Sequence, residues 1–176
     1  MNLLRRIFIT LVVLAAAAGF HVTTSVADPH GSVTLAVSGG TVWNTPDGIK
    51  RRFSFHGRQY TDGTVDGEWE LVAGSAIMHG DVVCLTLVDS HTARLGGHVD
   101  QSLFSSFRPN TDIGWIATDL GEGVNAGDET TNLRAFRNAP VGSAEQFCLN
   151  GQLPFPGPDL AIDGIDHGNV QILHAP

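Results

Sequence analysis

The run Thr64-Val-Asp-Gly-Glu-Trp-Glu-Leu-Val72 alternates apolar and acidic side chains. Successive side chains of an extended chain point to opposite faces, so this alternation is typical of a strand with one buried and one solvated face. We expect the side chains of Val65, Trp69 and Leu71 to point inward. Those of Asp66, Glu68 and Glu70 should point outward, toward solvent. Asp62-Gly63 comes directly before the run and predicts a tight turn, because glycine adopts positive φ without steric cost. The stretch therefore predicts a hairpin that leads into an antiparallel strand.

Short runs of the same kind recur on both sides of this strand, separated by turn signals. The predicted strands span residues 32–37, 52–56, 64–72, 81–89, 92–99, 113–120, 132–136 and 170–173. Gly96-Gly97 lies inside one of them and predicts a bulge or a barrel corner. Strands at a spacing of about ten residues indicate an all-β fold, an antiparallel β-barrel or β-sandwich of about 8–9 strands.

The segment from 138 to 163 differs from the rest of the chain. It contains Pro140, Pro154, Pro156 and Pro158, which cannot donate to a strand ladder, so we expect a long loop or a flap there. We therefore divide the chain into residues 28–137, a β-domain core, and residues 138–176, a Pro/Gly-rich extension whose final strand packs on the core.

Residues 1–27 are expected to form a signal peptide. Arg5 and Arg6 precede an apolar run from 7 to 20, and Ser25-Val-Ala27 offers small residues for cleavage. The run is shorter than the roughly 20 apolar residues of a membrane span, and no later stretch approaches that length. We expect a secreted or extracytoplasmic protein with no integral membrane segment after cleavage.

The charge of the processed chain is strongly negative. Of ten Lys and Arg residues, two leave with the leader, and eight remain against 18 Asp and Glu, a formal net charge of −10. Such a surface repels phosphate backbones, so nucleic acid is not an expected partner, and it gives anionic lipids no polybasic patch.

Cys84 and Cys148 are the two cysteines. An even count in an exported chain favours a disulfide, whereas the apolar sequence around each residue would also suit two buried free thiols.

Three short motifs resemble a family of exported bacterial β-proteins with no assigned activity. They are Asp62-Gly-Thr-Val-Asp-Gly-Glu68 after an aromatic strand, His79-Gly-Asp-Val-Val-Cys-Leu85 with Thr92-Ala-Arg-Leu-Gly-Gly97, and Asp119-Leu-Gly-Glu-Gly123. The resemblance covers about residues 39–137. It implies a β-barrel or β-sandwich and brings no catalytic residues with it.

Asp119, Glu122 and Asp128 lie in a glycine-rich acidic loop. Clustered carboxylates on a loop suit Ca²⁺, so this loop is a candidate calcium site, although the sequence as a whole indicates no cofactor. The ligand pattern of an EF-hand is absent, and a solvated turn whose side chains bind their own backbone is the alternative.

Several polar or aromatic side chains on the predicted strands are candidates for a site. They are His56, Glu68, Trp69, His79 and His98. His79 and His98 could converge from neighbouring strands and, with Asp81, bind zinc, although a strand histidine is often only hydrogen-bonded structure.

The aromatic residues allow two interpretations. In a barrel, Trp43, Trp69, Trp115, Phe53, Phe55, Phe104 and Phe107 could line a cavity for a small hydrophobic ligand, or they could simply fill the core.

The sequence contains neither a G-x-S-x-G elbow nor a nucleotide-binding glycine loop. We therefore expect a binding or cell-envelope interaction module. A secreted enzyme, such as a barrel isomerase or cyclase or a hydrolase acting on a small apolar substrate, is the alternative.

Overall fold

A computed structural model describes residues 29–44, 48–105, 107–121, 127–131, 134–136, 140, 142–152, 162–164 and 167–175. The predicted signal peptide lies outside the described residues. The strands are β1 (Val33–Asn44), β2 (Lys50–Tyr60), β3 (Val65–Ala73), β4 (Ala76–Leu87), β5 (Thr92–His98), β6 (Gln101–Ser102), β7 (Asp112–Thr118), β8 (Glu129–Thr131), β9 (Arg134–Ala135), β10 (Ile162–Gly164) and β11 (His167–His174). One helix, α1 (Ser143–Asn150), follows β9 in the chain.

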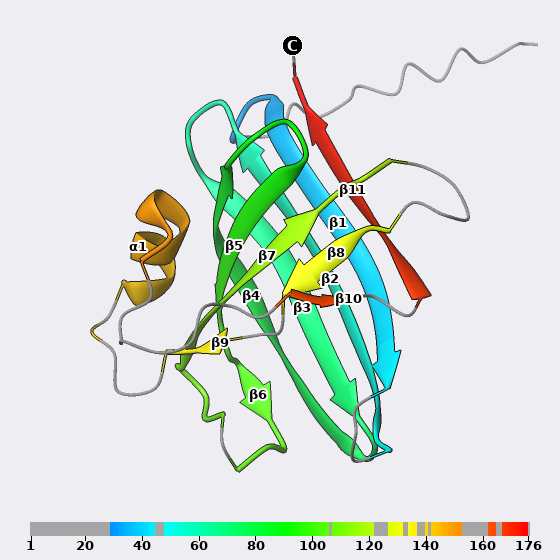
Figure 1. Cartoon of the computed structure of the whole chain (residues 1–176). Helices are drawn as coiled ribbons and strands as arrows, with labels where there is room; N and C mark the ends of the chain where they lie inside the picture. The colour runs from blue at the N-terminus through cyan, green and yellow to red at the C-terminus, as the bar shows by residue number, and fades with distance from the viewer. Residues whose placement is uncertain are drawn as a thin grey trace, which may run out of the picture.

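The strands form one antiparallel sheet that curls into a nearly closed barrel (Figure 1). Its order is β10-β8-β7-β5-β4-β3-β2-β1-β11, with β6 paired to β4 and β9 paired to β7 off this path. The all-β antiparallel prediction is confirmed, and the curvature of the sheet favours the barrel over the sandwich. The expected final strand is present as β11, which pairs with β1.

Inward and outward residues alternate as the sequence predicts, and the inward residues form the core. Phe53, Phe55, Trp69 and Leu71 are buried, while Glu68 and Glu70 are exposed. β2 and β3 therefore carry an apolar face toward the barrel interior and a polar face outside.

A β-bulge interrupts β4 where it pairs with Gly96 and Gly97 of β5. The register shifts between Val82 and Cys84, so the extra residue is Val83. The glycine pair correctly predicts an irregularity here, but the inserted residue belongs to the neighbouring strand. Because of the bulge, Val82 packs in the main core while Cys84 packs against α1.

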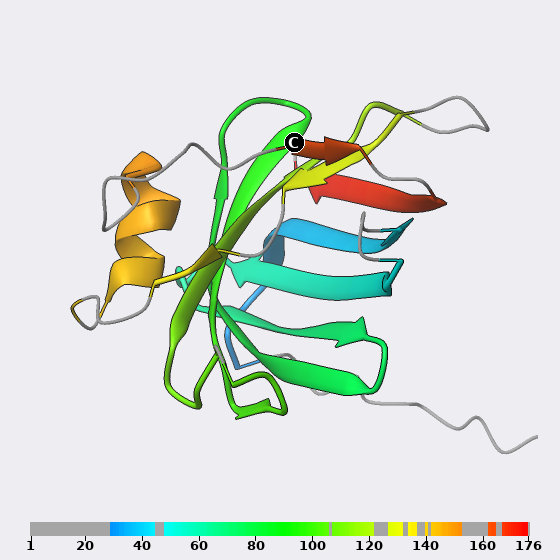
Figure 2. The same ribbon diagram turned by 60° about the horizontal axis from the view of Figure 1, so that its bottom comes forward.

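Helix α1 was not predicted, because the prolines around it indicated a loop. It lies outside the barrel and contacts β4, β5 and β7 (Figures 1 and 2). Gly96 and Gly114 are opposite each other in the β5–β7 register, and a side chain on either would collide with α1 or its neighbours. These two glycines therefore create the flat surface on which the helix rests.

Three contacts hold α1 on this surface. Cys84 and Cys148 form a disulfide, which confirms the favoured pairing. Asp112 Oδ2 accepts the backbone N–H of Ala144 at 3.1 Å, and Arg94 donates to the carbonyl of Cys148 at 3.3 Å. The carboxylate lies at the positive end of the helix dipole and the guanidinium at its negative end, so both charges stabilise the helix.

Side-chain carboxylates bond the outer edge of β11. Asp128 Oδ2 accepts the backbone N–H of Val170 at 2.7 Å, and Asp119 Oδ2 accepts that of Ile172 at 3.1 Å. Asp119 follows β7 and Asp128 precedes β8. Both strands lie across from β11, at the seam where the two ends of the sheet meet. Carboxylates thus replace the carbonyls of a neighbouring strand where the barrel closes.

Candidate functional site

An open groove of about 650 Å³ lies on the outer face of β2, β3 and β4. Two rows of cross-strand neighbours form its floor. His56, Glu68 and Asp81 stand opposite one another in register, and so do Ser54, Glu70 and His79. Directly opposed side chains in a sheet have Cβ atoms roughly 4.5–5.5 Å apart, so each row is a contiguous line of polar groups.

The groove is acidic. Glu68, Glu70, Asp81 and Asp100 line it, and the described residues of its lining include neither lysine nor arginine. Glu68 and Asp81 are directly opposed like charges, an arrangement that destabilises a sheet. In the part of the chain that the structure describes, none of these four carboxylates forms an ion pair. The groove can therefore offer several carboxylates to a cationic partner.

A charged pair borders the groove on the side of the β2–β3 turn. Arg58 donates two hydrogen bonds to Asp66, both 2.9 Å, and Tyr60 Oη donates a third of 2.9 Å. Partial burial raises the pKa of Asp66, but these hydrogen bonds outweigh that effect and leave the pKa below the ordinary aspartate value. Arg58 is therefore committed to Asp66, which leaves the acidic character of the groove intact.

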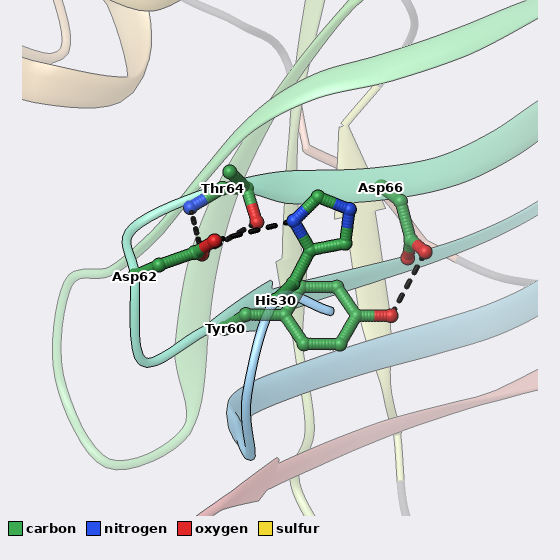
Figure 3. Close-up of polar contacts among 5 residues, drawn as sticks. All are labelled: His30, Tyr60, Asp62, Thr64 and Asp66. Atoms are coloured by element: carbon green, nitrogen blue, oxygen red, sulfur yellow. Dashed lines mark hydrogen bonds and ion pairs between the residues drawn. The ribbon is translucent and has the colours of Figure 1, made fainter. Parts of the chain in front are cut away.

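The first described residues are anchored at the same turn (Figure 3). His30 Nδ1 lies 3.2 Å from Asp62 Oδ2, and the His30 ring is 5.5 Å from that of Tyr60. Thr64 donates to Asp62 through its hydroxyl and its backbone N–H, and these hydrogen bonds hold the pKa of Asp62 below its ordinary value. The predicted Asp62-Gly63 turn is confirmed, since Gly63 has a φ of 85°.

The structure separates the predicted polar candidates. His56, Glu68 and His79 line the groove together with the backbone of Trp69, whose ring is buried in the barrel. His98 does not line it: His98 Nδ1 lies 2.8 Å from Asp112 Oδ1, beside α1. The described residues include no group of three or more His, Cys, Asp or Glu side chains arranged to hold a metal, so we propose no zinc site.

The acidic loop candidates are placed in part. Asp119 and Asp128 use carboxylate oxygens to accept backbone N–H groups at the barrel seam, while Glu122 lies outside the described residues. Calcium remains a prediction from the sequence.

The aromatic candidates mostly pack on one another inside the barrel. The Trp115 ring lies 5.4 Å from Phe53, 5.7 Å from Phe55 and 6.4 Å from Trp69. Phe104 and Phe107 pack at the edge of this core, and the side chain of Trp43 is outside the described part.

Sequence reasoning missed Ser54, Glu70 and Asp100 as groove residues. Glu70 is exposed, as predicted. Alternation within one strand, however, does not reveal which residues of neighbouring strands stand beside it. The β2–β3 and β3–β4 registers supply that information.

Comparison with protein-family models, with curated proteins and with solved structures found no match. No helix in the described part of the chain has the length and hydropathy that a membrane crossing needs.

Proposed function

We propose that this chain is an exported binding module that uses the groove on β2, β3 and β4 to hold a positively charged partner at or outside the cell envelope. The observation that carries this proposal is the set of four carboxylates, Glu68, Glu70, Asp81 and Asp100, in one groove whose described lining contains no lysine or arginine. The leader-like N-terminus and the Cys84–Cys148 disulfide support export, since disulfides persist in oxidising compartments.

The facing of the candidate residues supports binding over catalysis inside the barrel. His56, Glu68 and His79 lie on the outer face, and His98 is paired with Asp112. An isomerase or cyclase working on an enclosed apolar substrate would need an acid or base directed inward. These four residues, the best candidates for that role, are directed elsewhere.

The like-charge pair also supports a binding role. Folding alone gains nothing from Glu68 opposite Asp81, and such a pair is destabilising by a few tenths of a kcal/mol or more. A bound cation between the two carboxylates would remove that repulsion, so the cost of the pair would be recovered on binding.

A cationic probe tests the proposal directly. Fluorescein-labelled octalysine is titrated with the leaderless protein in about 50 mM and 150 mM salt, and binding is followed by anisotropy. The double variant Glu68→Gln/Asp81→Asn should bind about three- to tenfold more weakly, because each exposed charge pair contributes roughly 0.2–1 kcal/mol.

Glu145→Gln/Glu129→Gln is the matched control, since it removes the same charge from α1 and β8. Equal weakening in both variants would show that octalysine senses only the net charge, and the groove proposal would then be wrong.

A further inference from the structure

Two polar atoms inside the barrel have no hydrogen-bond partner. Thr41 Oγ1 and Trp115 Nε1 are the buried side-chain N and O atoms of the described residues left without one. Thr41 is 2% exposed and Trp115 is 0% exposed, so water outside the barrel cannot serve them. Native proteins pair almost all such groups, frequently with an enclosed molecule, because an unpaired buried polar group is costly.

The two atoms belong to side chains that adjoin the same ring. Thr41 stands opposite Phe53 in the β1–β2 register, and the rings of Phe53 and Trp115 are 5.4 Å apart at 83°. The side chains that carry the unpaired hydroxyl and the unpaired indole N–H therefore both neighbour Phe53 in the core.

The surroundings define the chemistry of a guest in this region. An indole N–H only donates, whereas a hydroxyl both donates and accepts, so an oxygen atom with free lone pairs can serve both groups. The neighbouring side chains Phe53, Phe55 and Trp69 are apolar rings, among which a charged guest would be strongly disfavoured. The face of Phe53 is only a weak acceptor for the indole N–H.

We propose that the barrel interior is a second binding site, which encloses a small neutral guest that presents oxygen to Trp115 Nε1 and Thr41 Oγ1. A buried water molecule and a small organic molecule with a carbonyl, hydroxyl or ether oxygen share this chemistry. The inference is independent of the outer groove, because it uses none of the groove's charged residues.

A crystal structure of the leaderless protein, at a resolution that shows ordered water, tests the proposal. Density within hydrogen-bond distance of Trp115 Nε1 and Thr41 Oγ1 is expected. A single spherical peak would identify water, and extended density with a matching added mass in native mass spectrometry would identify an organic guest. Absence of density beside both atoms would overturn the proposal.

Thr41→Val provides a second test by the sign of its effect. Valine keeps the shape of threonine and removes the hydroxyl. If the hydroxyl binds a guest, the substitution lowers the urea midpoint and removes or displaces the density. If the hydroxyl is truly unpaired, the substitution removes a buried cost and raises the midpoint, a result that contradicts the proposal.

Discussion

Single carboxylates in this protein serve very different purposes according to what faces them. Asp112 and Asp128 are buried and accept backbone N–H groups, Asp66 is paired with Arg58, and Asp81 faces another carboxylate across β3 and β4. Residue type and local sequence do not distinguish these roles, since each aspartate lies in or beside a strand. The register of the sheet does.

Asp81→Asn should make the protein more stable. The substitution removes the like-charge repulsion with Glu68, and relief of a directly opposed pair is worth about 0.2–1 kcal/mol. Urea unfolding at neutral pH measures the change, with Glu129→Gln of β8 as the control. A lower midpoint for Asp81→Asn would show that the carboxylate has a stabilising partner, contrary to the groove described above.

Asp66→Asn should weaken the acid sensitivity of the fold. The pKa of Asp66 is lowered in the folded state, so its stabilising contribution is present above the unfolded pKa and is lost as pH falls through the lower folded value. Urea midpoints are compared at pH 6 and pH 3. The difference between these midpoints should be smaller in Asp66→Asn than in the unsubstituted protein, and an equal difference would contradict the assignment.

At the scale of elements, α1 depends on the strands beneath it more than on its own sequence. It has eight residues, and its N-cap residue, Gly142, makes no side-chain capping bond. Isolated helices of this length are marginal in water. Asp112, Arg94 and the disulfide to Cys84 supply from β4, β5 and β7 what the helix lacks.

Replacing both cysteines by alanine should loosen α1 and lower the stability of the protein. The disulfide joins residues 64 positions apart, and removal of a crosslink of this kind typically costs about 2–4 kcal/mol. Urea unfolding gives the loss, and hydrogen exchange should show faster exchange in α1 while β1 to β3 retain their protection. Unchanged exchange in α1 would mean that the hydrogen bonds of Asp112 and Arg94 hold the helix in place without the disulfide.

The same elements show which features of the fold and of the groove could be predicted from the sequence. Alternation in 64–72 correctly predicted which side of β3 is buried, and Asp62-Gly63 predicted the turn before it. Helix α1 could not be recognised because its anchors, Asp112 and Arg94, come from strands distant in sequence. The groove was only partly foreseen for the same reason: His56, Glu68 and Asp81 meet only through strand pairing.

At the scale of the whole molecule, the sheet is closed by side chains. β11 pairs with β1 on one edge, and on the other its N–H groups bond Asp119 and Asp128. Asp128 also accepts the N–H of Leu120 at 2.9 Å, so it ties the chain after β7 to β11. The integrity of the barrel seam therefore depends on a buried carboxylate with two acceptor oxygens.

Asp128→Asn should destabilise the whole protein. The amide keeps one acceptor and turns an NH₂ group toward the other backbone N–H, which leaves a buried donor unpaired at a cost of about 1–3 kcal/mol. Urea unfolding followed by circular dichroism measures the loss, and the exposed Asp100→Asn is the control. Equal midpoints for the two variants would show that the seam does not rely on Asp128.

The carboxylates along β11 also bear on how copies of this protein behave toward each other. An uncovered strand edge can recruit the backbone of another molecule, and that is how many β-proteins begin to polymerise. Here the amide groups of Val170 and Ile172 are already engaged, and an incoming strand would meet two negative charges in place of free donors. The hydrogen bonds that close the barrel therefore also cover the strand edge at which pairing between copies would begin.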